Sequence, residues 1–521
     1  MYRHSHQILI CTVILTISFI GATPFLFAQN GEHTVFVPIV LSAAGMNGSF
    51  FSSEMTITNG GSQTAIMDFT YTAAFGEGSG TGTDSLGPGE QRIVPDAISY
   101  LKSIGIPIPT TGSRGGTLRV KFSGLSSVSD GAVTVRTTTA VAGGHAGLAY
   151  AGIPTSMGLT GTSYLCGLRQ NSTDRSNVAV QHVGSQTDGD ILLHLTVISG
   201  DAAHPFSQAL PDITLSPGGF MQISGILQAN GMNVSNGYVR VERIIGAAPY
   251  YCYGVINDQA NSDGSFVSPV PEDMMAGRQG MMLPVMVEAS GFTTELVVTN
   301  WSSVRKTLNC GYMSNGIQAP HSMANFTLEV NPSEQLIMPD FVQRMRNMSG
   351  MSMMMPMGTS YAGAMSAGIN GMDMSGISIT ARTSTPGGGG RFGVFYGSMP
   401  YGMASTSQAW VYALQQNAEN RSNLAIVNTG ETDGSTDDFR IELFDGDSGI
   451  LVKVIDGITV DANGWMQMGS ILAQNAPNTS QGYARVTRMS GNNPFMVYGV
   501  INDGGQPGER TGDGAFLLST P

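Results

Sequence analysis

Residues Asn236–Asp258 read NGYVRVERIIGAAPYYCYGVIND, and 245 positions later residues Gln481–Asp503 read QGYARVTRMSGNNPFMVYGVIND. Thirteen of these 23 aligned positions are identical, which indicates a duplicated structural unit. In the first arm Val239 and Val241 alternate with polar residues, the period-2 pattern of a strand with one buried face. A turn marked by Gly246 follows, and the second arm is apolar on both faces, as in a strand covered on two sides. We therefore expect a β-hairpin in each copy.

Matches outside this stretch extend the duplication, with a period close to 246 residues, over most of the chain. Each long unit also contains a weaker internal repeat, since Leu86–Gln91 resembles Leu215–Gln222 and Gly116–Lys121 resembles Gly237–Glu242. The pattern predicts four modules in two long repeats, and the size of each module suits one β-sandwich. The long-range matches are Phe51–Asn59 with Phe292–Asn300, Glu90 and Gln91 with Glu334 and Gln335, Arg136 with Arg382, Tyr150 with Tyr396, and Arg175-Ser176-Asn177 with Arg421-Ser422-Asn423.

Short strands and turn signals alternate along each module, which predicts an all-β fold of tandem antiparallel sandwiches. One helical turn is expected where Asp96 caps the segment that holds Ile98 and Leu101, with Gly105 beyond its end. The predicted divisions are a signal peptide at 1–28, modules at 33–155 and 156–268, a linker at 269–282, a module at 283–400 with a methionine-rich insertion, and a last module at 401–519.

The strand motif FSSEMTITN, the Leu-x-Pro-Gly corner and the closing NDQANSDGSF resemble a repeated β-rich module of uncharacterised exported bacterial proteins. More distantly they resemble bacterial immunoglobulin-like domains that serve as spacers or adhesive arms. The resemblance covers nearly all of the chain after residue 28. It implies an immunoglobulin-like sandwich architecture and an exported location, and it transfers no site residue.

The N-terminus has the charged, apolar and small-residue order of a secretory signal peptide, with cleavage expected after Ala28. We therefore expect a secreted or cell-surface protein without a membrane span in the mature chain. The formal net charge of −13 disfavours nucleic acids as partners. A low charged fraction of 12% and 69 glycines suit an exported β-protein better than a helical one.

Cys166 and Cys252 lie in the first and last predicted strands of one module, and Tyr412 and Val497 replace them in the second unit. Joint absence is what a disulfide predicts, because a lone partner would leave a free thiol in an oxidising compartment. We expect this disulfide, with two buried free thiols as the alternative. Cys310 has no evident partner.

Residues 348–374 hold nine of the 31 methionines. Thioethers favour Cu(I), so this segment is a candidate copper site without any other cofactor. The alternative is packing, because methionine fills irregular apolar space. The candidate ligands are Met351, Met353, Met355, Met357, Met372 and Met374.

For three further motifs we favour a structural interpretation over a functional one. Gly446–Gly449 matches the serine-protease tetrad GDSG, with His321 as the one suitable upstream histidine, but a turn explains it. The acidic loop from Asp258 to Gly264 could bind Ca²⁺, yet it lacks the glutamate of the helix-loop-helix template. The repeated Arg-Ser-Asn triplets indicate a structural turn.

The sequence thus predicts a non-catalytic exported protein with a structural or adhesive role, whose protein or glycan partner is not identified. The alternative is a ligand-binding protein for Cu(I) or for a glycan. A glycan site would need exposed aromatic residues in a cleft, and the three tryptophans, Trp301, Trp410 and Trp465, all fall in the second unit. We do not expect an enzyme, because no acid, base or nucleophile set recurs.

Overall fold

The computed structural model describes residues 33–314, 323–370 and 374–520. The predicted signal peptide at 1–28 lies outside these residues. Strands account for 57% of the described residues and helices for 7%, and every pair of neighbouring strands in this part of the chain is antiparallel, so the all-β prediction is confirmed. The strands form four groups that follow one another along the sequence.

The first group is one nine-stranded sheet in the order β4-β3-β6-β1-β2-β7-β8, with β5 paired to β2 and β9 paired to β1. Its central strand β1 pairs with β6 along most of its length and with β2 at its end. The strands are β1 (His33–Ala44), β2 (Phe50–Asn59), β3 (Ala65–Phe75), β4 (Gly80–Leu86), β5 (Gln91–Val94), β6 (Arg114–Ser123), β7 (Gly131–Val141), β8 (Gly144–Ala151) and β9 (Ile153–Pro154).

The third group has the same order, β23-β22-β25-β20-β21-β26-β27, with β24 paired to β21 and β28 paired to β20. Each strand takes the place of its counterpart in the first group. The strands are β20 (Gly280–Ala289), β21 (Phe292–Asn300), β22 (Lys306–Ser314), β23 (Ala324–Val330), β24 (Gln335–Met338), β25 (Tyr361–Gly368), β26 (Ile377–Gly387), β27 (Gly390–Gly397) and β28 (Met399–Pro400).

The second group contains a six-stranded sheet, β13-β12-β16-β10-β19 with β14 on β12, and a four-stranded sheet, β15-β11-β17-β18. Pro269 separates β18 from β19, since proline cannot donate to a ladder. The strands are β10 (Ser163–Arg169), β11 (Asp174–His182), β12 (Ile191–Ser199), β13 (Ser207–Ala209), β14 (Ile213–Leu215), β15 (Phe220–Ile223), β16 (Asn236–Ile245), β17 (Tyr250–Asp258), β18 (Gly264–Val267) and β19 (Val270–Pro271).

The fourth group is a single eight-stranded sheet, β32-β31-β34-β29-β36-β35-β30-β33. Its strand β36 is continuous and pairs with both β29 and β35. This strand therefore joins into one sheet the strands whose counterparts in the second group form two separate sheets. The strands are β29 (Gln408–Gln415), β30 (Asn420–Asn428), β31 (Asp437–Asp445), β32 (Leu451–Val460), β33 (Trp465–Met468), β34 (Gln481–Ser490), β35 (Phe495–Asp503) and β36 (Gly514–Thr520).

The hairpins expected at the two copies of the opening stretch are wrong. The first arm, β16, pairs with β10 and β12, whereas the second arm, β17, pairs with β11 and β18. The turn at Gly246, with φ of +90°, therefore carries the chain from one sheet to the other. Strands β34 and β35 of the fourth group likewise do not pair with each other: β34 pairs with β29 and β31, and β35 pairs with β30 and β36. A period-2 pattern reports a buried face but not which strand supplies the hydrogen bonds.

The helical segments are short. The capped turn predicted at Asp96 is confirmed as α1 (Ala97–Ser103), whose cap side chain accepts a hydrogen bond from the Ser99 N–H, and Gly105 follows with φ of +97°. The others are α2 (Phe341–Arg346) and α3 (Ile471–Asn475), with 3₁₀ turns η1 (Met46–Gly48), η2 (Val128–Asp130), η3 (Thr155–Met157) and η4 (Ile226–Gly231).

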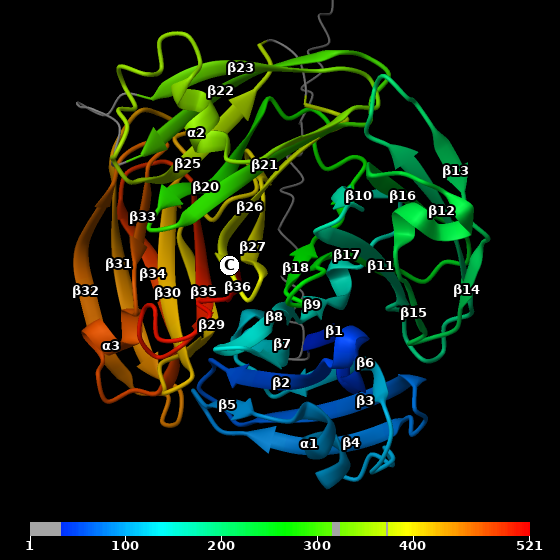
Figure 1. The fold of residues 1–521 in the computed structure, drawn as a ribbon. Helices are drawn as coiled ribbons and strands as arrows, with labels where there is room; N and C mark the ends of the chain where they lie inside the picture. The colour runs from blue at the N-terminus through cyan, green and yellow to red at the C-terminus, as the bar shows by residue number, and fades with distance from the viewer. Residues whose placement is uncertain (1–32, 315–322, 371–373, 521) are drawn as a thin grey trace, which may run out of the picture.

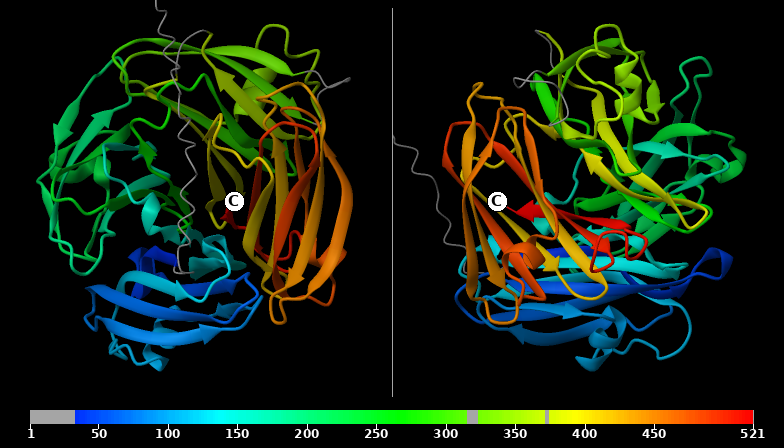
Figure 2. Two further views of the ribbon diagram at one scale, coloured as in Figure 1. Left: turned by 180° about the vertical axis from the view of Figure 1, so that it is seen from behind. Right: turned by 60° about the vertical axis from the view of Figure 1, so that its left-hand side comes forward.

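The four groups are arranged around a common centre, so that the fourth group lies beside the first (Figure 1). Figure 2 shows the same arrangement from behind and from the side. Strands β8, β18, β27 and β36, one from each group, contact one another around the centre. The segment 269–282, predicted as a linker, contains β19 and the start of β20 and buries Met275 and Met281.

Candidate functional site

The four interfaces between groups are of two kinds. The first and second groups share one continuous apolar core, in which Tyr150 and Tyr253 lie edge to face at 5.5 Å between ring centroids. The third and fourth groups meet similarly through Tyr396 and Tyr498 at 5.7 Å. These contacts explain why β17 is buried on both faces. The second–third and fourth–first interfaces are instead polar, and the recurring residues of the sequence gather there.

A buried glutamine, Gln335, joins the second and third groups. Its Oε1 accepts a hydrogen bond from the Gly167 N–H at 2.6 Å, and its Nε2 donates to Asn236 Oδ1 at 2.7 Å and to the Gly237 carbonyl at 2.9 Å. Its own N–H donates to the Gly200 carbonyl at 2.9 Å. Gly167 has φ of +86° and lies at a bulge in β10. The bulge leaves this N–H outside the β10 ladder and free to bind the glutamine.

The equivalent glutamine, Gln91, joins the first and fourth groups with the same pattern. Its Oε1 accepts from the Ala413 N–H at 2.8 Å, and its Nε2 reaches the Leu414 carbonyl and Gln481 Oε1, each at 3.5 Å. Its N–H donates to the Gly446 carbonyl at 2.6 Å. Ala413 holds φ of +64°, a left-handed conformation that is unfavourable for a residue with a Cβ. The bulge is therefore kept even where glycine is replaced.

A buried arginine accompanies each glutamine. Arg382 donates from Nη1 to Asp174 Oδ1 at 2.9 Å and from Nε to Ser265 Oγ at 3.0 Å. Its counterpart Arg136 donates to the neutral amide oxygen of Asn420. Both arginines are more than 90% buried. An ion pair at one interface thus corresponds to a charge–amide contact at the other.

At a second pair of positions an ion pair at one interface again corresponds to a charge–amide contact at the other. Arg169 Nη1 lies 2.6 Å from Glu295 Oε2 across the second–third interface. At the fourth–first interface Gln415 Nε2 donates to Glu54 Oε1 at 2.7 Å. The second–third interface is therefore the more ionic of the two.

Loops from the second and fourth groups cover one edge strand of each nine-stranded sheet, at the centre of the molecule. Strands β8 and β27 end those sheets, and four aspartates accept hydrogen bonds from their free N–H groups. Because these N–H groups are occupied, the edges are closed to other strands. The contacts are His145 N–H to Asp503 Oδ2 at 3.1 Å, Gly147 N–H to Asp513 Oδ2 at 2.8 Å, Arg391 N–H to Asp258 Oδ2 at 2.9 Å and Gly393 N–H to Asp263 Oδ2 at 2.9 Å.

Two of these aspartates meet at the centre of the molecule. Asp263 and Asp513 are both buried, and each carboxyl group affects the pKa of the other. Burial raises the pKa of both groups, against the opposing effect of Arg382 on Asp263 and of Arg136 on Asp513. The pair is a buried acidic contact between the second and fourth groups.

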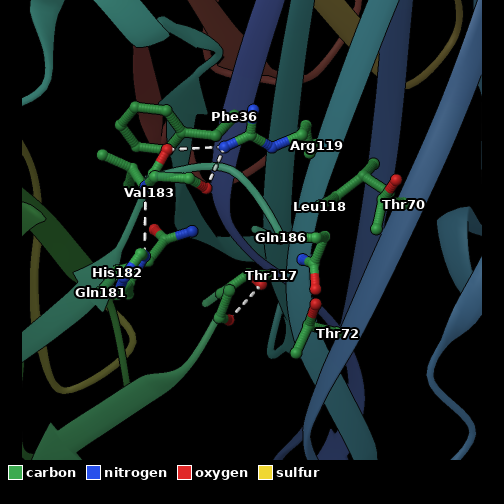
Figure 3. Close-up of a pocket in the computed structure, with 12 residues that line it drawn as sticks. Phe36, Thr70, Thr72, Thr117, Leu118, Arg119, Gln181, His182, Val183 and Gln186 are labelled. Atoms are coloured by element: carbon green, nitrogen blue, oxygen red, sulfur yellow. Dashed lines mark hydrogen bonds between the residues drawn. The ribbon is translucent and has the colours of Figure 1, made fainter. Parts of the chain in front are cut away.

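Figure 3 shows a small pocket between the first and second groups. Arg119 donates to the carbonyls of Val183 and Gly184, and Thr117 Oγ1 donates to the Gly218 carbonyl at 2.7 Å. His182 Nδ1 accepts from the Gly184 N–H at 3.1 Å. The cavity measures about 10 Å³, the space of one water molecule. It is a packing defect between two sheets and too small for an organic ligand.

A larger pocket of about 360 Å³ lies on the surface where the second group meets the third. Its aromatic wall is Trp301, stacked on Tyr164 with 4.5 Å between centroids and 18° between planes. Tyr164 Oη donates to Glu272 Oε1 at 3.0 Å, and Lys306 also lines the pocket.

The predicted disulfide is absent: Cys166 and Cys252 are both free and buried. Cys252 belongs to the core of the first and second groups, whereas Cys166 faces the third group with Tyr164 and Tyr238. Burial raises the pKa of the Cys166 thiol to about 12, although hydrogen bonds to third-group hydroxyls oppose the shift. The two cysteines change in the second unit for separate reasons, one at an interface and one in a core.

The five described candidate copper ligands differ in their environments. Met351, Met355 and Met374 belong to the apolar core of the third group. Met353 and Met357 are 87% and 86% exposed, and Met372 lies outside the described residues. Core packing accounts for the buried members. Among the described residues no cluster of three or more His, Cys, Asp or Glu side chains could hold a metal ion.

The GDSG tetrad is a turn, in which Ser448 Oγ donates to Asp445 Oδ1 at 2.6 Å. His321 lies outside the described residues. The Asp258 loop is an Asx turn whose carboxylate accepts from the Ala260 N–H at 2.8 Å. The Arg-Ser-Asn triplets also bind backbone, since Ser176 Oγ accepts from the Arg169 N–H at 2.9 Å. Sequence reasoning recorded Gln91 and Gln335 as recurrent but did not assign them to an interface.

A scan of protein-family profiles gives no match to the chain, and a search of curated protein sequences gives none either. Within the described ranges, no helix is both long enough and apolar enough to cross a membrane.

Proposed function

We propose that the protein is a non-catalytic structural or adhesive element of the cell surface or extracellular space. It would consist of two long repeats, each of two immunoglobulin-like sandwiches. The identical strand order of the first and third groups supports the repeats, as do interface contacts that recur about 246 positions apart.

One observation carries the proposal. The polar residues that recur between the two halves are engaged in contacts between groups. Gln91 and Gln335 bind bulged strands, Arg136 and Arg382 bind the same interfaces, and the acidic loops cover sheet edges. Repetition here preserves a rigid assembly of sheets, which suits a scaffold.

Fractionation of the native host tests the location. An antibody against the full chain should detect the protein in the envelope or the medium, because the first 28 residues predict export. Retention in the cytoplasm would overturn the exported location.

A strain that lacks the protein tests the role. It should lose adherence or envelope integrity and regain it when the full chain is restored. Unchanged adherence and integrity in that strain would contradict a structural or adhesive role. Restoration with the Arg382→Met variant provides a matched comparison, because this change is expected to weaken one interface between groups.

A further inference from the structure

The pocket between the second and third groups contains two charged side chains, Glu272 and Lys306, that form none of the contacts between groups described above. Its walls come from β10, from the loop that joins β21 to β22, from the start of β22 and from the turn before β26. Its volume of about 360 Å³ is large enough for one or two sugar rings. The lining residues are Tyr164, Glu272, Trp301, Ser302, Ser303, Lys306, Ser375 and Gly376.

Trp301 provides a fixed aromatic wall. One face of the indole stacks on Tyr164, and the backbone N–H of Trp301 donates to the Gly376 carbonyl at 2.9 Å, which fixes the main chain at this position. The side chain stays partly exposed at the pocket. A rigid, half-exposed indole presents an apolar surface against which the C–H face of a pyranose ring can pack.

Lys306 gives the pocket a cation. The residue as a whole is 7% exposed, so its aliphatic stem is buried, while its ammonium group stays accessible at the pocket. A bound anion would make a charge-assisted contact with this group. The lysine therefore favours a ligand with a negative group.

The remaining polar groups select for hydroxyl groups beside that anion. Glu272 already accepts a hydrogen bond from Tyr164 Oη at 3.0 Å, and its exposed carboxylate can accept more. The Ser303 side chain is exposed at the same rim. Hydroxyl donors near Glu272 and a carboxylate near Lys306 are what an acidic sugar provides.

The equivalent position at the fourth–first interface lacks these features. Gly60 and Ala65 take the places of Trp301 and Lys306. Tyr412 fills the space beside Gly60, where a Cβ would lie 2.9 Å from its Oη, and donates to the Ser129 carbonyl at 3.0 Å. The pocket is therefore an addition to the shared framework and not a consequence of it.

We propose that this pocket binds a uronic acid residue of an acidic polysaccharide. The sugar ring packs on Trp301, its carboxylate pairs with Lys306, and its hydroxyl groups donate to Glu272. This inference deepens the proposed adhesive role and rests on it, because it names the class of surface that the protein would contact. The chain's net charge of −13 offers no general attraction for an anionic polymer, so the local lysine has to provide the recognition.

Titration calorimetry of the purified full chain with an oligogalacturonate tetrasaccharide tests the proposal. Binding is expected, with affinity reduced at least about tenfold by Trp301→Ala and by Lys306→Met. The methyl ester of the same tetrasaccharide lacks the charge and should bind the unmodified chain at least about tenfold more weakly. For the ester, Lys306→Met should change the affinity little, because no carboxylate remains to pair with the ammonium.

Matched controls separate the site from general effects. Trp410→Ala and Lys453→Met remove a partly exposed tryptophan and an exposed lysine of the fourth group and should leave binding unchanged. Lys306→Met keeps the side-chain length and the buried aliphatic stem, so this change should not unfold the chain. Circular dichroism of each variant should match that of the unmodified protein.

Equal affinity for the acid and its methyl ester would overturn the assignment of Lys306, and no heat up to about 10 mM ligand would overturn the site. Preference for a neutral or a sulfated tetrasaccharide would also contradict it. These failures leave the structural role intact if the deletion strain still loses envelope integrity. Cytoplasmic retention would remove the adhesive role even if the sugar binds.

Discussion

The second–third and fourth–first interfaces use one framework with different charges. At both, a buried glutamine binds a bulged strand and an arginine enters the same contact. The partners of the arginines are Asp174 at one interface and Asn420 at the other. This difference teaches that geometry is carried by the glutamines and the backbone, while the ionic contacts are variable additions.

The two interfaces should differ most in the stability that is lost when the buried arginine is removed. Arg382→Met leaves the carboxylate of Asp174 buried without its cation, which should lower the free energy of unfolding by about 3–5 kcal/mol. Arg136→Met breaks a charge–amide hydrogen bond and no ion pair of the described residues, so the loss should be smaller, about 1–2 kcal/mol. Urea unfolding of the full chain measures both.

The matched control is Arg382→Met combined with Asp174→Asn, which copies the neutral partner at the other interface. Part of the lost stability should return in this double variant. Equal losses for the two single arginine variants would contradict the view that the interfaces differ in charge.

Truncation of the glutamines should lower the free energy of unfolding by a smaller amount. The loss should again be larger at the second–third interface than at the fourth–first interface. Gln335→Ala leaves the Gly167 N–H and the Gly237 carbonyl unpaired and should cost about 2–3 kcal/mol. Gln91→Ala removes longer bonds, two of them at 3.5 Å, and should cost about 1–2 kcal/mol. Thermal unfolding followed by near-ultraviolet circular dichroism checks the order, and a reversed order would contradict it.

The central aspartate pair should make stability depend on pH. Burial raises the pKa of Asp263 from its ordinary value of 3.8 to about 6. The folded state therefore holds this proton more tightly, so the pair's contribution is complete below pH 3.8 and is lost as pH rises through about 6.

Asp263→Asn removes the carboxyl group whose pKa is raised, so the variant should lack this pH dependence. Compared with the unmodified chain, the variant should lose about 1–2 kcal/mol less stability between pH 4 and pH 7. Unfolding by urea at a series of pH values provides the measurement. Parallel pH profiles for the two proteins would contradict a raised pKa for Asp263.

The smallest expected effect concerns the cysteines. Because Cys166 and Cys252 are free, a reducing agent should leave the free energy of unfolding unchanged. Both thiols should react with a labelling reagent in denaturant without reduction, and neither should react in the native chain. A loss of stability of several kcal/mol on reduction would restore the disulfide hypothesis.

Features that depend only on neighbouring residues, such as caps and turns, were predictable from the sequence. The Asp96 cap and the following helical turn depend on neighbouring residues alone, and both are present. The apolar second arm at residues 250–256 was also read correctly as a strand covered on two sides. Its partner strands were not, because ladder pairing is decided between residues distant in the chain.

The candidate site shows the same limit. Recurrence singled out Gln91 and Gln335, but nothing near them in the sequence names the bulges that they bind. The predicted disulfide was wrong because two replacements with separate causes look like one joint loss. Lys306 gave no signal in the sequence, since a position at a pocket is visible only when the surrounding strands are known.

By itself the sequence determined that this protein consists of short strands, turns and one well-capped helical turn, with a long period of about 246 residues. Alternation, turn residues and capping act over a few positions, so they can be read directly. Only the tertiary structure decided that the groups meet around a centre, where the carboxyl groups of Asp263 and Asp513 are buried together. That contact joins residues 250 positions apart, and burial, which no local pattern reports, sets its chemistry.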